Sequence, residues 1–206
     1  MIEKNTDIRK LAIFGGTFDP VHIGHKRILR AAGKLLGLDR AFIIPAKEPP
    51  HKEGTKITSG EDRLEMCKTA FAGLPKAVVS DWELTREGKS YSIDTVTGIK
   101  GLFPDAKIFF LMGSDMFMSV DSWHRSDELL KLCIPVCMPR AADNVDLLKI
   151  QAAKLGKALV IDLKPLDISS TQIRELIAAE RWDEAGKYLD SGVLAYIRAH
   201  GLYTRS

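Results

Sequence analysis

The sequence predicts an α/β fold: a Rossmann-like parallel β-sheet with helices on both faces and a small C-terminal helical cap. Short, almost continuously apolar runs alternate with longer segments of helical spacing, as in sheets covered on both faces. After residue 161 the spacing is mostly helical. No repeat or linker divides the 206 residues, so one domain is expected over 1–206, with the cap at about 165–206.

Each element is predicted from its apolar pattern. Six near-continuous runs predict strands at 11–14, 41–44, 77–79, 108–112, 133–138 and 158–161. Apolar residues at helical spacing predict helices at 22–36, 60–72, 92–102 and 145–155, then 169–179, 183–189 and 192–200 in the cap. Parallel sheets of this kind bind ligands beyond the carboxyl ends of their strands. The residues that follow each strand are therefore the first candidates for a site.

Composition excludes several classes of protein. Hydrophobic residues make up 45% and charged residues 28%, and 30 Lys and Arg against 27 Asp and Glu leave only +3, which argues against a nucleic-acid partner. A polar N-terminus and the lack of a long apolar stretch predict a cytoplasmic protein with no membrane partner. Cys67, Cys133 and Cys137 form no CxxC pair, and the last two lie in an apolar run that predicts buried, reduced thiols.

The first predicted strand leads into the string GGTFDPVHIGH, from Gly15 to His25. Gly15 and Gly16 allow a tight turn, and the helix that follows points its positive end at a ligand, which favours phosphate. His22 and His25 project from one helix face and could donate hydrogen bonds to phosphate oxygens during a reaction. Helix capping or core packing is the alternative for each histidine, and a metal pair is disfavoured because no third ligand stands at the usual spacing.

This string resembles the (H/T)xGH signature of the nucleotidyltransferase superfamily, and its full length is similar to the nicotinate mononucleotide (NaMN) adenylyltransferases. The resemblance implies that His22 and His25 are catalytic and stabilise charge on the phosphates of ATP. It also implies ATP contacts from the backbone of Gly15, Gly16, Thr17 and Phe18.

A second segment, ISSTQIR, begins the predicted cap and ends at Arg174. Ser169 and Gln172 form a plausible capping box, which alone would explain the segment structurally. Ser170 and Thr171 exceed what capping needs, and Arg174 lies one turn beyond Thr171 on the same face. The segment resembles the ISSTxxR signature of the same superfamily, which implies that Ser170, Thr171 and Arg174 bind the β- and γ-phosphates of ATP.

A carboxylate, Asp115, stands just after the predicted strand 108–112 and behind Gly113. A carboxylate at a strand end can accept both hydroxyls of a ribose, and a helix N-cap is the alternative use. The GxD pattern resembles the same family, which implies that Gly113 and Asp115 bind the adenosine ribose of ATP.

Further segments resemble the NaMN branch, and their residues are expected to bind the acceptor: Lys52 in PAKEPPHK, Tyr91 and Ser92 in SYSIDT, Trp123 in Trp-His, and Arg140. The resemblance implies backbone donors around Tyr91 and Ser92 for a nicotinate carboxylate, with Trp123 stacked on the ring. Core packing is the alternative for Trp123. Ser92 stands where the family has Thr, and Ala-Ala follows Arg140 in place of Pro-Gly, which leaves the position of Arg140 open.

The resemblance covers nearly the whole chain and implies an adenylyltransferase that moves AMP from ATP to NaMN, giving nicotinate adenine dinucleotide and pyrophosphate. No Ser-His-Asp or Cys-His set is suggested, so we expect direct in-line attack with ATP and NaMN as the partners. Mg²⁺ should bridge the triphosphate with few protein ligands, and we expect no separate protein metal site. The alternatives are adenylyl transfer to nicotinamide mononucleotide or to another phosphorylated acceptor, and a non-catalytic nucleotide sensor.

Overall fold

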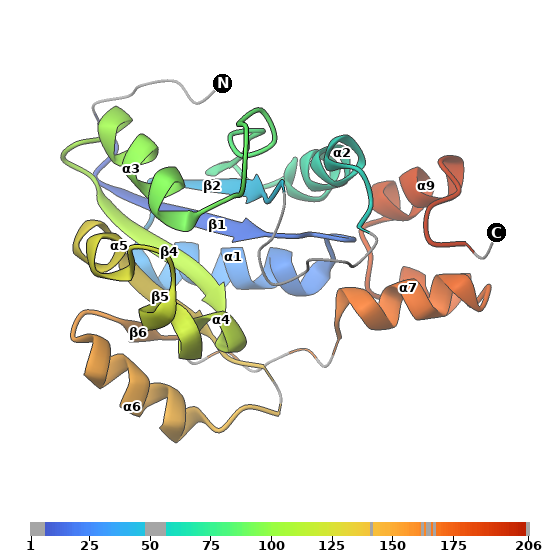
Figure 1. The fold of residues 1–206 in the computed structure, drawn as a ribbon. Helices are drawn as coiled ribbons and strands as arrows, with labels where there is room; N and C mark the ends of the chain where they lie inside the picture. The colour runs from blue at the N-terminus through green and yellow to red at the C-terminus, as the bar shows by residue number, and fades with distance from the viewer. Residues whose placement is uncertain are drawn as a thin grey trace.

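The computed structural model describes residues 7–47, 57–140, 142–161, 163, 166 and 168–204. Its centre is one parallel sheet with the strand order β3-β2-β1-β4-β5-β6 (Figure 1). The six predicted strands are all present, as β1 (Lys10–Gly16), β2 (Arg40–Pro45), β3 (Ala77–Val79), β4 (Lys107–Gly113), β5 (Ile134–Met138) and β6 (Leu159–Val160). The predicted α/β fold with a parallel sheet is confirmed.

Helices cover both faces of the sheet, and neighbouring strand residues enter different cores. Ala12 and Phe14 of β1 belong to the cluster that includes α1 (Ile23–Leu36) and α2 (Gly60–Phe71). Leu11 and Ile13 belong to the opposite cluster, which includes α3 (Ser92–Leu102) and α6 (Val145–Leu155). Because both faces are buried, the strands are apolar along their length instead of alternating.

Two short helices lie outside the predicted set: α4 (Ser114–Ser119) and α5 (Ser126–Leu132), joined through the 3-10 turn η2 (Val120–Ser122). Six and seven residues make two turns at most, which is too few to display a helical period in the sequence. Since α4 begins directly at the end of β4, the predicted Asp115 lies in the first turn of a helix.

The C-terminal helices are α7 (Ser170–Ala178), α8 (Trp182–Gly186) and α9 (Ser191–Ala199). In Figure 1, α7 and α9 lie on the side toward which the arrowheads of β1 and β2 point. Ile173, Ile177, Val193 and Ile197 are fully buried in the same cluster as α1 and α2. This shared core fixes the start of α7 next to the carboxyl ends of the strands.

The three cysteines are free and buried, as predicted for Cys133 and Cys137. Burial raises the pKa of Cys133 and of Cys137 to about 12, so neither is a thiolate nucleophile near neutral pH. Within the described ranges, no helix combines the length and apolar character needed to cross a membrane.

Two glycines of α3 differ in what surrounds them. A Cβ on Gly98 would lie 2.5 Å from Cζ2 of Trp82, whereas a Cβ on Gly101 would meet nothing within 4 Å. Gly101→Ala should raise the free energy of unfolding by about 0.5–1 kcal/mol, because alanine favours the helix and restricts the unfolded chain. Gly98→Ala should lower it by about 1–3 kcal/mol, because the indole must move. Urea denaturation measures both, and equal effects would contradict this packing.

Candidate active site

The predicted site lies where the strand order reverses. From β1 the chain runs to β2 and β3 on one side and then returns to β4 on the other side of β1. Connections that leave in opposite directions open a crevice at the carboxyl ends of such strands. Since Phe14 of β1 pairs with Leu111 of β4, the turn at Gly15 and Gly16 leaves the sheet beside Gly113.

His22 and His25 form the capping box at the start of α1. His22 is the N-cap, and its Nδ1 accepts the backbone N–H of Gly24 at 3.2 Å. His25, at the third helical position, accepts the backbone N–H of His22 on its own Nδ1 at 3.1 Å. Serine and glutamate usually make this reciprocal pair, so the two histidines do have the capping role that was the alternative to chemistry.

These contacts determine which nitrogens the two rings present. Burial lowers the pKa of His22 to about 4, and burial, His22 and Arg140 together lower the pKa of His25 well below 6.5. Both rings are therefore neutral at pH 7. Because each Nδ1 accepts a hydrogen bond, the proton of each neutral ring is on Nε2. The site thus holds two Nε2–H donors with ring centroids 3.8 Å apart.

Two glycines make room for this arrangement. A Cβ on Gly24 would lie 2.8 Å from Nδ1 of His22, so any side chain there would displace the capping ring. A Cβ on Gly16 would lie 2.9 Å from the ring of Phe18. That ring is buried and lies 5.1 Å from the His25 ring, centroid to centroid. The glycine turn and the histidines therefore form one packed unit.

The start of α7 is bound to the turn that follows β1. Arg174 Nη1 donates to the carbonyl of Asp19 at 2.7 Å, and the Ser170 hydroxyl donates to the carbonyl of Pro20 at 2.9 Å. Arg174 Nη2 also donates to the hydroxyl of Thr171 at 3.2 Å. The two signatures, about 150 residues apart in sequence, are thus in direct contact. The predicted capping box of Ser169 with Gln172 is confirmed.

Two buried polar residues, one within the turn and one that contacts it, are missing from the predicted site. Arg63 of α2 is 2% exposed and donates from Nη1 to the carbonyl of Thr17 at 2.9 Å. Asp19 is 3% exposed and accepts the hydroxyl hydrogen of Tyr203 at 2.7 Å. A sequence signal for Arg63 exists, since it occupies the helical stripe of α2 that is otherwise apolar: Met66, Cys67 and Ala70.

Asp115 and Arg140, predicted for the ATP ribose and the acceptor, lie together at the ends of adjacent strands. Arg140 Nη2 donates to Asp115 Oδ2 at 2.9 Å, with both side chains about half exposed. A Cβ on Gly113 would lie 2.9 Å from Asp115 Oδ1 and 3.3 Å from Arg140 Nη2. Glycine before Asp115 therefore leaves space for this ion pair.

The predicted acceptor residues of α3 and of the segment after η2 also meet. Tyr91 is the N-cap of α3 and Ser92 its first residue, and no side chain caps this helix start. The Tyr91 ring lies 4.4 Å from that of His124, the neighbour of the half-buried Trp123. An uncapped helix start beside aromatic rings suits a flat anionic group. Lys52 lies outside the described residues.

Taken together, the arrangement favours binding and moving phosphate groups. Hydroxyl, guanidinium and imidazole groups meet around the turn between β1 and α1, whereas no three His, Cys, Asp or Glu side chains within the described ranges could hold a metal ion together. Such a site can stabilise changing phosphate charge by positioned donors.

Protonation of His22 should link stability to pH. Its pKa of about 4 in the folded protein lies below the ordinary 6.5. As the pH drops from 6.5 to 4, the unfolded chain therefore binds a proton at His22 before the folded protein does, and the free energy of unfolding falls. The loss should reach about 3 kcal/mol. His22→Asn keeps a capping acceptor but does not titrate, so its stability should fall less over this range. Urea denaturation at several pH values measures this, and parallel curves for both proteins would contradict it.

Comparison with known proteins places the chain in a family. Residues 13–176 match the family model described as Cytidylyltransferase-like. A probable nicotinate-nucleotide adenylyltransferase of Dehalococcoides mccartyi is 36% identical over 201 residues, which cover 95% of this chain and 98% of that protein. A relative of the same description from Pseudomonas syringae pv. tomato is 38% identical over 211 residues, with coverage of 95% and 94%.

A solved structure, Plasmodium falciparum nicotinic acid mononucleotide adenylyltransferase complexed with NaAD, shares the fold with a TM-score of 0.82 at 21% identity, over 95% of this chain and 97% of that one. Its complex with APC gives a TM-score of 0.80 at the same identity and coverage. The family follows from the relatives above 30% identity and from the matched family model. The chain belongs to the cytidylyltransferase-like family and, within it, to the nicotinate-nucleotide adenylyltransferases.

Proposed function

We propose that the protein transfers the adenylyl group of ATP to NaMN, forming nicotinate adenine dinucleotide and releasing pyrophosphate. The observation that carries this proposal is the pair of neutral imidazoles whose Nδ1 atoms accept helix N–H groups. Their Nε2–H groups are thereby left as donors next to a glycine turn. A sensor needs affinity for ATP, but it does not need donors arranged around the phosphorus atom that reacts.

ATP would lie where the turn after β1 meets the start of α7. The backbone of residues 15–18 would contact the α-phosphate, beside His22 and His25. The β- and γ-phosphates would lie at the start of α7, where the helix dipole attracts anions. The residues predicted to bind these two phosphates are Ser170, Thr171 and Arg174, two of which already contact the turn. Asp115, half exposed at the end of β4, would accept hydrogen bonds from the ribose hydroxyls.

NaMN would bind toward α3 and the Trp123 segment. A carboxylate accepts hydrogen bonds only, and the start of α3 offers backbone N–H donors without a side-chain cap. A carboxamide would turn its NH₂ group toward some of these donors, which favours nicotinate over nicotinamide. Arg140 is assigned to the 5′-phosphate of the acceptor, since its charge is close enough to His25 to lower the pKa of that ring.

The reaction follows from this placement. An oxygen of the NaMN phosphate attacks the α-phosphorus of ATP in line with the bond to the β-phosphate, which breaks as pyrophosphate leaves. His22 and His25 donate hydrogen bonds to the oxygens on which charge shifts, so no proton has to leave the protein. No covalent intermediate is required, in keeping with the raised pKa of the buried cysteines.

Mg²⁺ is proposed to enter with ATP. The described residues hold no group of three metal-ligating side chains, so the ligands would be mainly phosphate oxygens and water, which this cation prefers. When bound, it neutralises negative charge on the triphosphate. A cytoplasmic location is also proposed, because three free thiols fit a reducing compartment.

Pyrophosphate release tests the proposal. With ATP and Mg²⁺, NaMN should support release about tenfold faster or more than nicotinamide mononucleotide at matched concentration, because the amide leaves donors unpaired. Chelation of Mg²⁺ should stop release. A preference for the amide would contradict the assigned acceptor while leaving the chemistry intact. ATP binding without release with any phosphorylated acceptor would contradict the enzyme and favour the sensor.

A further inference from the structure

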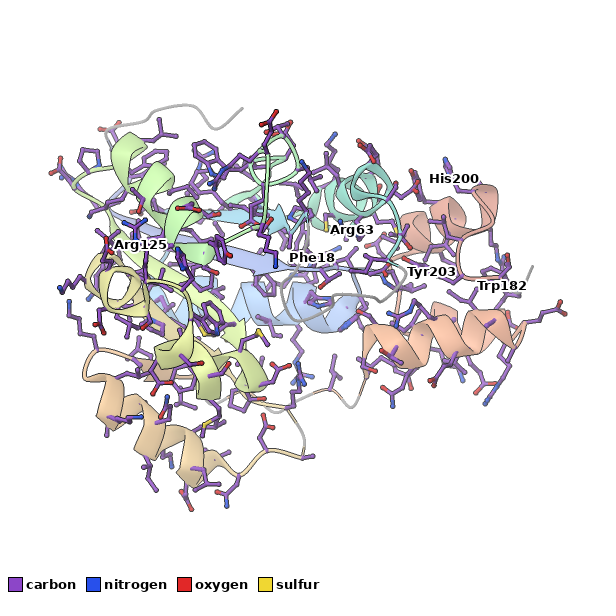
Figure 2. All side chains as sticks on the ribbon, viewed as in Figure 1. Phe18, Arg63, Arg125, Trp182, His200 and Tyr203 are labelled. Carbon is purple, nitrogen blue, oxygen red and sulfur yellow. The ribbon has the colours of Figure 1, made fainter. Side chains whose placement is uncertain are left out.

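We propose that Arg63 and Tyr203 are positioning residues for adenylyl transfer, holding the backbone on either side of Phe18 so that its ring keeps His25 in place. This inference rests on the function proposed above. Arg63 comes from α2 and Tyr203 from the C-terminal end of the chain; both are labelled with Phe18 in Figure 2.

Arg63 is a buried cation that donates to three backbone carbonyls. Its Nε donates to Thr58 at 2.9 Å, and its Nη1 donates to Thr17 at 2.9 Å and to Ala46 at 2.7 Å. The turn after β1 and both ends of the connection between β2 and α2 are therefore joined at one guanidinium. Burial lowers the pKa of Arg63, and the nearby carboxylate of Asp19 opposes this effect.

Tyr203 holds the other side of Phe18. Its hydroxyl donates to Asp19 Oδ1 at 2.7 Å, while Asp19 Oδ2 accepts the backbone N–H of Thr58 at 3.4 Å. The carboxylate is 3% exposed, so this hydrogen bond is not exchanged for water. A residue next to the C-terminus is thus attached to the turn that precedes the histidines.

Phe18, between the two attachment points, has a backbone that needs support. Its φ of 52° lies in the left-handed region, which residues with a Cβ avoid. The ring is 2% exposed and packs edge-on against His25 at 5.1 Å and against Phe14 at 5.3 Å. If either attachment is lost, the turn can relax toward ordinary φ values, and the ring then moves away from His25.

A contribution to stability alone does not explain why Arg63 and Asp19 are buried here. Buried charges lose hydration, and apolar replacements of similar volume are often equally stable or more so. What an apolar side chain cannot do is fix the carbonyl of Thr17 and the carboxylate of Asp19 in particular directions. The contacts therefore specify the conformation of the turn next to the reacting phosphate.

A comparison of two tyrosine variants tests the proposal. Tyr203→Phe removes only the hydroxyl that contacts Asp19. Tyr196→Phe is the matched control, because the Tyr196 hydroxyl also joins the C-terminal part of the chain to a carboxylate, Asp62 Oδ1 at 2.8 Å, which belongs to α2 and not to the turn. With the folded fraction matched by circular dichroism, Tyr203→Phe should lower kcat about tenfold and change KM for ATP less than about twofold, since the ground-state phosphate contacts remain. Tyr196→Phe should keep the wild-type kcat.

A purely structural role would give a different pattern. Wild-type kcat in folded Tyr203→Phe, or equal losses in both variants, would overturn the proposal. Arg63→Lys is the second variant, since one ammonium keeps the charge but cannot reach three carbonyls in the directions of the guanidinium. It should also lose kcat with little change in KM for ATP. If Tyr203→Phe does not fold, Arg63→Lys tests the proposal in its place, and a wild-type kcat in Arg63→Lys would overturn it.

A readout without turnover separates this inference from the proposed function. The ring of His25, followed by NMR titration, should show a higher pKa in Tyr203→Phe, because a displaced Phe18 ring admits water, and an unchanged pKa in Tyr196→Phe. If the wild-type protein itself releases no pyrophosphate, the proposed function fails and this titration alone tests the positioning. Identical His25 titrations in the two variants would then overturn it.

Discussion

The structure depends on how the chain satisfies its own carbonyl groups in the turn between β1 and α1. This turn leaves the sheet at the point where the strand order reverses, and it must remain compact without a regular hydrogen-bonding partner. Side chains from distant segments supply the donors. The donors to the carbonyls of Thr17, Asp19 and Pro20 are, in that order, the side chains of Arg63, Arg174 and Ser170. The conformation of the turn therefore depends on contacts with α2 and α7.

Helix capping and chemistry are not alternatives at this site. In α1 the residues of the capping box are themselves the proposed phosphate donors, because accepting on Nδ1 leaves the proton of each neutral ring on Nε2. In α7 the division is different. Ser169 and Gln172 form the capping box, which leaves Ser170 and Thr171 for contacts outside it. The same local motif, a capping box, thus occurs at both helix starts that are proposed to bind phosphate, and its residues are used differently in each.

Much of the fold could be predicted because it depends on local patterns. The six strands are continuous apolar runs, and the box of Ser169 with Gln172 is a short-range signature. The helices α4 and α5 could not be predicted, because each is too short to show the helical spacing of apolar residues. The contacts of Tyr203 with Asp19 and of Arg140 with Asp115 join segments far apart in sequence, and no spacing rule predicts them. Arg63 could be noticed in the sequence, because it is a charged residue within an otherwise apolar helical stripe. Its partners could not be predicted, because they are backbone carbonyls, which every residue has.

In the proposed function, the imidazole of His25 acts on the reacting phosphate in addition to capping α1. The most direct measurement is turnover with ATP and NaMN in His25→Gln, since glutamine at this position retains the capping acceptor, as Gln172 does in α7. We expect kcat to fall about 10²-fold or more in both His25→Gln and His25→Ala, the size of one lost preorganised donor. Only His25→Ala should also lose helix stability. Near-normal turnover in His25→Gln would show that His25 is a cap alone and would contradict the account.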